Sequence, residues 1–236
     1  MSDGNKIKIA KEHAVYIDIA TPTGRLSHPH IIAIDTMAKK WKIGIILPLE
    51  GPLVDKLKAA FVEVAKKCTH PGWPAELKQL QMALKKGDSI NASRVLGGKA
   101  PNEHLVGKYF LSATRVEAQG PVTVVDPLRN PVDPKRVLGG LNGKLGITIA
   151  PYATSELVTK EDGTKYSRIA YGVTAYLNSI MLMGGGEPFG GAGDGTGVFE
   201  EDEEVAAAKK AVESGNFSQP GAAAGSAVPA ADGDVF

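Results

Sequence analysis

The sequence lacks several features that would assign a function directly. Cys68 is the only cysteine in 236 residues, which excludes an internal disulfide and a zinc site built from several cysteines. No run of about 18 apolar residues is present, and the first residues lack the apolar stretch of a signal peptide. We therefore expect no membrane association and residence in the cytoplasm of the cell that makes the protein.

Motifs of metal sites and of common enzyme classes are also missing. The five histidines are scattered, and only His28 and His30 stand close together, without a third residue at metal-ligand spacing. The glycine-rich segment lacks the Lys-Ser/Thr of a phosphate-binding loop, and no Gly-x-Ser-x-Gly turn occurs. These absences predict no metal, no cofactor and no catalytic residues, although a site assembled from distant positions stays open as an alternative.

Charge is divided unevenly along the chain. Residues 200–236 carry eight acids and two bases, a net charge of −6, which leaves +7 on residues 1–199. A basic body attracts phosphates and an acidic tail can imitate them, so the division points to a polyanionic partner. An acidic tail kept only for solubility is the alternative.

Hydrophobic periodicity predicts a mainly β protein with one or two helices. Alternation of period two marks strands in "AVYIDIA", "KWKIGIILP", "GKYFLSAT", "VTVVD", "GKLGITIAPY" and "KYSRIAYGVTAYLNSIML". Helical spacing follows Pro52 and runs to about Lys67. Short strands, one main helix and turn-rich joints are typical of a small Greek-key barrel or an open sandwich.

The remaining segments set the expected domain boundaries. Residues 70–106 show a short helical stretch around "PAELKQLQMALKKGD" and then "NASRVLGGKAPNEH", which we interpret as a surface loop. Eight of the sixteen residues 184–199 are glycine. We therefore expect a folded domain over 1–183, a linker over 184–199 and a flexible acidic tail over 200–236.

Aromatic and basic residues share the same predicted strands. Alternation in "KYSRIAYGVTAYL" places Ile169, Tyr171, Val173, Ala175 and Leu177 on the core side, and Tyr166, Arg168, Thr174 and Tyr176 on the solvent side. Exposed rings and cations together are what unpaired bases and their phosphates require. Tyrosines that merely cover the sheet are the alternative interpretation.

The same reasoning extends the candidate set to neighbouring strands. Tyr152 falls on the side of its strand opposite Leu145, Ile147 and Ile149, and Trp41 is flanked by lysines. The phase of "GKYFLSATR" is ambiguous, because either Tyr109 or Phe110 could be the buried ring. The candidate stacking residues are Trp41, Tyr109, Tyr152, Tyr166 and Tyr176, and the candidate phosphate contacts are Lys40, Lys42, Lys108, Arg115 and Arg168.

Five segments taken in order resemble a known family. They are "KWKIGIILPLEGPLVDKLKAAFVEVAKK", "GKYFLSATR", "VVDPLRNPV", "ITIAPYAT" and "IAYGVTAYLNSIMLMGGGEPFGG". Together they resemble the bacteriophage single-stranded-DNA-binding proteins, over roughly residues 7–199 and most strongly over 107–191. The resemblance implies an oligonucleotide/oligosaccharide-binding (OB) barrel, and a non-enzymatic protein that coats single-stranded DNA during phage replication and recombination in the host cytoplasm.

The ending "DGDVF" resembles the acidic tip with a terminal or near-terminal phenylalanine found in such proteins, with fewer acids and without the usual proline. It implies that replication or recombination proteins are recruited through Asp232, Asp234, Val235 and Phe236. A homo-oligomer is a further expectation. A phage structural or assembly β-barrel that packs against copies of itself is the alternative function.

Overall fold

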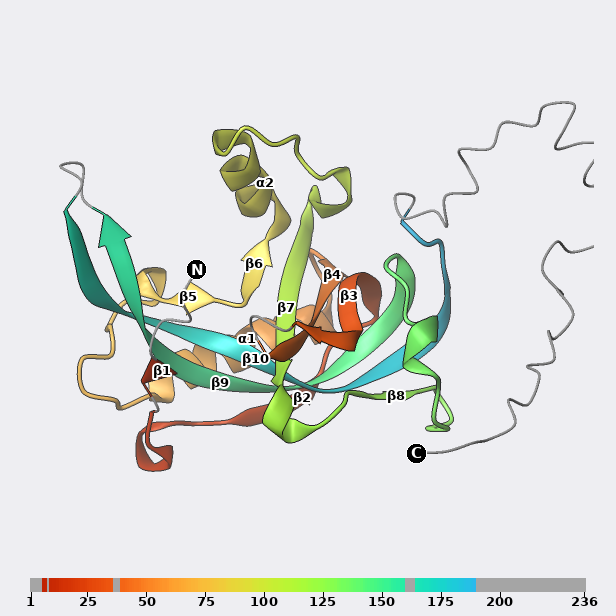
Figure 1. Cartoon of the computed structure of the whole chain (residues 1–236), viewed down its shortest axis with the longest axis horizontal. Coiled ribbons are helices and arrows are strands. Elements are labelled where there is room, and N and C mark those ends of the chain that lie inside the picture. The colour runs from red at the N-terminus through yellow and green to blue at the C-terminus, as the bar shows by residue number, and fades with distance from the viewer. Residues whose placement is uncertain (1–5, 8, 36–38, 160–163, 190–236) are drawn as a thin grey trace, which may run out of the picture. The chain divides into compact units, whose positions relative to one another are not determined.

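The chain was analysed as a computed structural model, which describes residues 6–7, 9–35, 39–159 and 164–189. Among these residues, ten strands and two α-helices form the elements of Figure 1. The helices are α1 (Pro52–Lys67) and α2 (Gly87–Leu96). The strands are β1 (Lys6–Ile7), β2 (Ile17–Ala20), β3 (Gly24–Asp35), β4 (Lys40–Pro48), β5 (Gln81–Met82), β6 (Leu84–Lys86), β7 (Lys108–Val116), β8 (Thr123–Val125), β9 (Leu141–Thr159) and β10 (Lys165–Gly186).

Strand pairing closes a barrel. Strand β9 pairs with β3, β3 with β4, β4 with β7, β7 with β10, and β10 returns to β9. All of these pairs are antiparallel except β7 and β10, which run parallel. A closed ring of five strands removes exposed sheet edges and is consistent with an OB-like fold. The prediction of a mainly β, OB-like protein is therefore confirmed.

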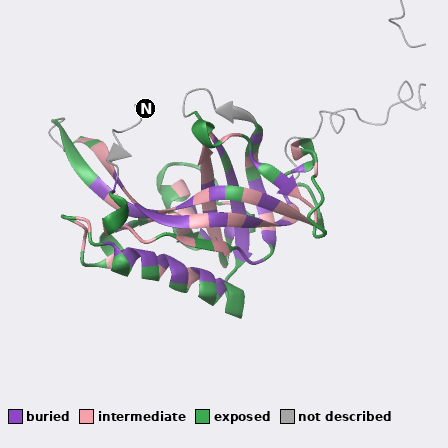
Figure 2. Cartoon of the chain, turned by 90° about the horizontal axis from the view of Figure 1, so that it is seen from below, coloured by how far each residue is buried: buried purple, intermediate pink, exposed green. Residues whose placement is uncertain are grey.

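The core lies inside the barrel and beneath α1. Alternate residues of each barrel strand point inward and are buried, among them Ile43, Ile45, Leu111, Ile147 and Leu177. Helix α1 packs against β2, β9 and β10 through Leu57, Phe61, Val64 and other apolar residues that recur every three or four positions. Figure 2 shows the buried positions along one side of this long helix. The expected helix from Pro52 to Lys67 is confirmed.

The expectations for residues 70–106 are met only in part. The region around "PAELKQLQMALKKGD" has one 3-10 turn at Leu77–Gln79 and otherwise forms the short strands β5 and β6. Helix α2 begins at the end of this region and continues into the segment interpreted as a loop, where a helix was not expected. Strand β3 was not anticipated either, because Pro29 and the positive φ of His28 interrupt its alternation. Strand β10 runs three residues beyond the expected domain end, to Gly186.

Candidate nucleic-acid interface

A cleft of about 730 Å³ opens on the outer face of the barrel, the side of the strands that points away from the core. Strands β4, β7, β9 and β10 form its floor, and α2 and the β5–β6 segment form part of its wall. Four aromatic residues line it: Tyr16, Phe110, Tyr152 and Tyr176. We call it the aromatic cleft.

Strand alternation explains why these rings face outward. In β7, Leu111 and Ala113 are buried in the core, so Phe110, Ser112 and Thr114 line the cleft between them. In β10, Val173, Ala175 and Leu177 are buried in the same way, which turns Thr174 and Tyr176 outward. The cleft is therefore a direct product of the period-two pattern that builds the core.

Two of the rings each lie against a glycine of a neighbouring strand, which leaves room for the ring. A Cβ atom at Gly172 in β10 would stand 2.6 Å from Cε1 of Tyr152, which lies directly opposite in β9. A Cβ atom at Gly44 in β4 would likewise clash with the ring of Phe110. Both rings thus lie close against backbone, where a side chain would displace them.

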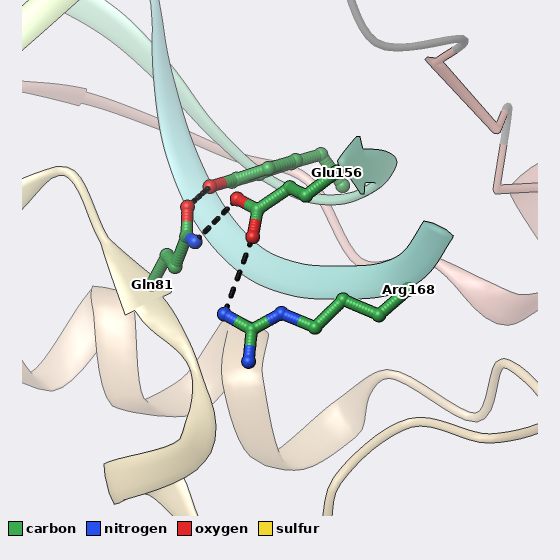
Figure 3. Close-up of polar contacts among 4 residues, drawn as sticks. Gln81, Glu156 and Arg168 are labelled. Atoms are coloured by element: carbon green, nitrogen blue, oxygen red, sulfur yellow. Dashed lines mark hydrogen bonds and ion pairs between the residues drawn. The ribbon is translucent and has the colours of Figure 1, made fainter. Parts of the chain in front are cut away.

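A chain of polar contacts fixes Tyr152 from its hydroxyl end and continues through Gln81, Glu156 and Arg168, which are labelled in Figure 3. The hydroxyl donates to Gln81 Oε1 at 2.9 Å, and Gln81 Nε2 donates to Glu156 Oε1 at 2.7 Å. Arg168 Nη2 lies 3.4 Å from Glu156 Oε2. Arg168, a predicted phosphate contact, therefore has a carboxylate partner within the chain, in an exposed pair of the kind that contributes about 0–1 kcal/mol to stability.

Burial favours the neutral form of the two central tyrosines. It is the main cause that raises the pKa of Tyr152, with Glu156 and Tyr176 adding smaller contributions. Burial also raises the pKa of Tyr176, assisted by Tyr16. Both rings therefore stay uncharged to a higher pH than a free tyrosine, and an uncharged ring does not repel phosphate.

Lysines surround the rings. Lys40 and Lys85 line the cleft. Lys42 is exposed and pairs in register with Thr114 of the cleft floor, so it lies on the same outer face. The cleft thus combines flat apolar surfaces with cations, as the predictions for Lys40, Lys42, Tyr152 and Tyr176 require. Whether these residues bind nucleic acid stays a prediction.

Three of the candidates that lie away from the cleft belong to the core or are held by backbone. Trp41 is only 9% exposed and belongs to the core, so the expectation that it offers a face to a base is wrong. Tyr109 packs against the core, and Phe110 is the outward ring of that pair. Arg115 donates to the carbonyls of Gln119, Gly120 and Leu177, which occupies its guanidinium in holding a loop.

The other predicted residues are distributed around the barrel. Lys108 lines a second, smaller cleft, and Tyr166 and Arg168 lie in the exposed outer part of the β9–β10 hairpin. Ile169, expected in the core, is 49% exposed. Asp232, Asp234, Val235 and Phe236 lie outside the described residues.

Sequence reasoning missed Tyr16, Phe110 and Lys85. The sequence did indicate that Tyr16 faces outward, because it alternates with Val15 and Ile17. Phe110 could be assigned only once the register of β7 against β4 placed Leu111 opposite Ile45. Lys85 belongs to β6, whose pairing with β7 brings it opposite Phe110.

Metal and membrane sites find no support in the part of the chain that the structure describes. No cluster of three or more histidine, cysteine or carboxylate side chains occurs among those residues. None of the described helices has the length and apolar character needed to cross a bilayer.

Comparison with known proteins gives one family and several solved structures. The family model described as "Enterobacter phage Enc34, ssDNA-binding protein" matches residues 17–210. The single-stranded DNA-binding protein from bacteriophage Enc34 in complex with ssDNA is 16% identical, with 80% of this chain and 100% of that chain covered and a TM-score of 0.46. A C-terminal truncation of the Enc34 protein is 17% identical, covering 77% and 90%, with a TM-score of 0.44.

A third solved structure is gp2.5, a single-stranded DNA-binding protein encoded by bacteriophage T7. It is 14% identical, with 80% of this chain and 97% of that chain covered and a TM-score of 0.39. The search of curated protein sequences gives no match.

Proposed function

The chain belongs to the Enc34 single-stranded-DNA-binding protein family, and on this premise we propose that it binds single-stranded DNA in the aromatic cleft without catalysing a reaction. The observation that carries the proposal is the gathering of Tyr16, Phe110, Tyr152 and Tyr176 in one cleft. Unpaired bases stack on such rings, each contact contributing about 1–3 kcal/mol with little dependence on base identity. Bases of a duplex are already stacked and paired, so duplex DNA offers these rings little.

Phosphates would be neutralised by the lysines around the rings. Lys40 and Lys85 line the cleft and Lys42 lies on the same face, so a strand whose bases enter the cleft passes its backbone near these cations. Binding of this kind weakens with salt, because each phosphate contact releases a condensed counterion. The protein would coat exposed single strands during phage DNA replication and recombination.

We also propose a role for the acidic segment 200–236 and a boundary for the DNA-binding part. Packing of Phe189 onto Arg25 and His104 favours extending the binding domain to residue 189. The net charge of −6 beyond residue 199 suits a segment that competes with phosphate for the lysines and recruits replication proteins when DNA displaces it. Asp232, Asp234, Val235 and Phe236 are the residues proposed to contact those partners.

The test is a titration of end-labelled oligo-dT, duplex DNA and RNA of equal length at two salt concentrations, followed by anisotropy. A label on the nucleic acid is preferable to intrinsic fluorescence, because Trp41 is in the core. Tight, salt-sensitive binding of oligo-dT and weak binding of duplex is the expected result. Salt-resistant self-association without DNA affinity would favour an assembly protein instead.

A further inference from the structure

One aromatic ring outside the aromatic cleft contacts two other flat groups. Phe189, the last residue described, has its ring centroid 4.4 Å from the guanidinium carbon of Arg25. The ring of His104 lies 4.4 Å from the same phenyl centroid at an interplanar angle of 30°. We call Arg25 and His104 the clamp. The two clamp residues come from β3 and from the loop after α2, and Phe189 comes from the segment after β10, so the arrangement is tertiary and not local.

Contacts that do not involve the Phe189 ring hold Arg25 and the turn that carries His104. Arg25 Nε donates to the carbonyl of Gly140 at 3.2 Å, which fixes the guanidinium from a neighbouring loop. Asn91 in α2 exchanges two hydrogen bonds with the backbone of Asn102, which supports the turn that carries His104. Departure of Phe189 would therefore leave a guanidinium and an imidazole available to contact another flat ring.

Two hydrogen bonds attach the segment that carries Phe189. Phe189 N–H donates to the Gly139 carbonyl at 2.9 Å, and Arg25 Nη2 donates to the Glu187 carbonyl at 2.8 Å. The backbone of residues 187–189 also lies close to Gly140, where an added Cβ atom would stand 2.1 Å from the Glu187 carbonyl oxygen. Gly184, Gly185 and Gly186, immediately before it, all have positive φ. Glycine adopts many backbone conformations at low cost, so these residues form a natural pivot for the segment.

The clamp adjoins the second cleft, which has a volume of about 450 Å³. Arg25 and His104 line this cleft together with Lys108, an exposed cation. Ile46, also in its lining, is the register partner of Phe110 in the aromatic cleft. Arg25 is in turn the register partner of Ile46, so β3, β4 and β7 carry both clefts on one outer face.

We propose that the clamp is a second base-binding site for single-stranded DNA and that Phe189 fills it in the free protein. This inference rests on the proposed function, because the strand reaches the clamp from the aromatic cleft. A base that contacts Arg25 and His104 replaces the phenyl ring with another flat ring, and Lys108 receives the adjoining phosphate. Oligonucleotides too short to extend past Phe110 leave Phe189 in place, whereas longer ones expel it.

The experiment uses the full chain with two substitutions at one position. Phe189→Ala removes the competitor, so long oligo-dT should bind about fivefold to tenfold more tightly, a gain within the value of one stacked base, and short oligo-dT should bind as before. Phe189→Trp places an indole in the clamp as a probe. Long oligo-dT should shift its emission toward that of a solvent-exposed indole, and wild type, with Trp41 and Trp73 alone, should show no comparable shift.

A second substitution identifies the clamp as the site. His104→Ala added to Phe189→Ala should abolish the gain for long oligo-dT, because one wall of the site is lost. If wild type binds oligo-dT but Phe189→Ala binds long oligo-dT equally or less tightly, the clamp is a structural anchor and the inference is overturned. If wild type does not bind oligo-dT at all, the proposed function itself fails, and the two failures are thereby distinguished.

Discussion

The ring of Phe110 in β7 lies so close to the backbone of Gly44 in β4 that a Cβ atom on Gly44 would stand 2.6 Å from both Cε2 and Cζ. Gly44→Ala must therefore push the ring out of position, although the substitution adds one methyl group. We expect oligo-dT affinity to fall by about 1–3 kcal/mol, the value of one stacking contact.

The control is to make Gly44→Ala in a chain that already carries Phe110→Ala and therefore lacks the ring. Without the ring, the nearest atom to the added methyl group is the Ser27 carbonyl oxygen at 3.3 Å, so the double variant should bind like Phe110→Ala alone. Full additivity of the two losses in anisotropy titrations would show that Gly44 acts by some route other than Phe110.

Tyr176 and Tyr171 lie on opposite faces of β10 and should respond differently to truncation. Tyr171 packs against the core and edge-on to Trp73, with ring centroids 5.6 Å apart, so Tyr171→Ala should lower unfolding free energy by about 2–4 kcal/mol. Tyr176→Ala should instead lower oligo-dT affinity by about 1–3 kcal/mol. Thermal melts and titrations of both variants check this, and an exchange of the two phenotypes would refute the assigned faces.

Arg115 and Lys42 are expected to have different roles: Arg115 stabilises the fold, and Lys42 is proposed to contact phosphate. Arg115→Ala leaves three carbonyls without their charged donor, so a loss of stability of about 1.5–3 kcal/mol or more is expected, with oligo-dT affinity nearly unchanged. Lys42→Ala should leave the melting temperature unchanged and reduce the slope of log K against log salt by about 0.7. If Arg115→Ala loses much of its oligo-dT affinity at a temperature where it is folded, Arg115 contacts DNA after all.

The raised pKa values of Tyr152 and Tyr176 predict that the free energy of unfolding falls at alkaline pH. Because folding favours their neutral forms, this contribution is complete below the ordinary pKa of 10.0 and is lost as pH rises through the higher pKa of the folded state. Above pH 10.0 the unfolding free energy of wild type should fall more steeply than that of Tyr152→Phe/Tyr176→Phe. Phenolate absorbance should show a late-titrating component in wild type that each single Phe variant reduces.

Removing residues 200–236 tests the proposed competition by the acidic segment. Loss of a net charge of −6 should tighten oligo-dT binding, most strongly at low salt where screening is weakest. Phe236→Ala should leave DNA affinity unchanged and abolish binding to a replication partner such as a polymerase, primase or nuclease. Weaker DNA binding by the truncated chain would assign the segment to the DNA site or to an oligomer contact.

Strict alternation made most of the fold predictable. Val173, Ala175 and Leu177 fixed the phase of β10 and with it the outward direction of Tyr176. In α2 the helical pattern is absent for a physical reason: Val95 and Leu96 are exposed, and the helix is held through the buried amide of Asn91. A helix attached by hydrogen bonds has no apolar face for periodicity to detect.

The candidate site was less predictable, because strand register decides which ring reaches the cleft. Tyr109 and Phe110 are adjacent and chemically similar, and only the pairing of β7 with β4 selects Phe110. Arg115 looked equivalent to the lysines in sequence, yet the chain reversal at Gly120 brings backbone carbonyls to its guanidinium. Side-chain chemistry suggested the class of site, and long-range pairing selected its members.

Closure of the barrel has a consequence for synthesis on the ribosome. Strand β10 is the last of the described strands to be made, yet it pairs with β5, β7, β8 and β9. Strand β2 likewise cannot pair until β9 has been made. Between the end of β4 and the end of β10 lie 138 residues (186 − 48). Translation delivers about 5–20 residues per second, so roughly 7–28 seconds pass before the ring can close. During that interval the apolar strands of the nascent chain lack their partners and the cleft is incomplete. We therefore expect the cleft to form in a single late step and not gradually as the chain lengthens.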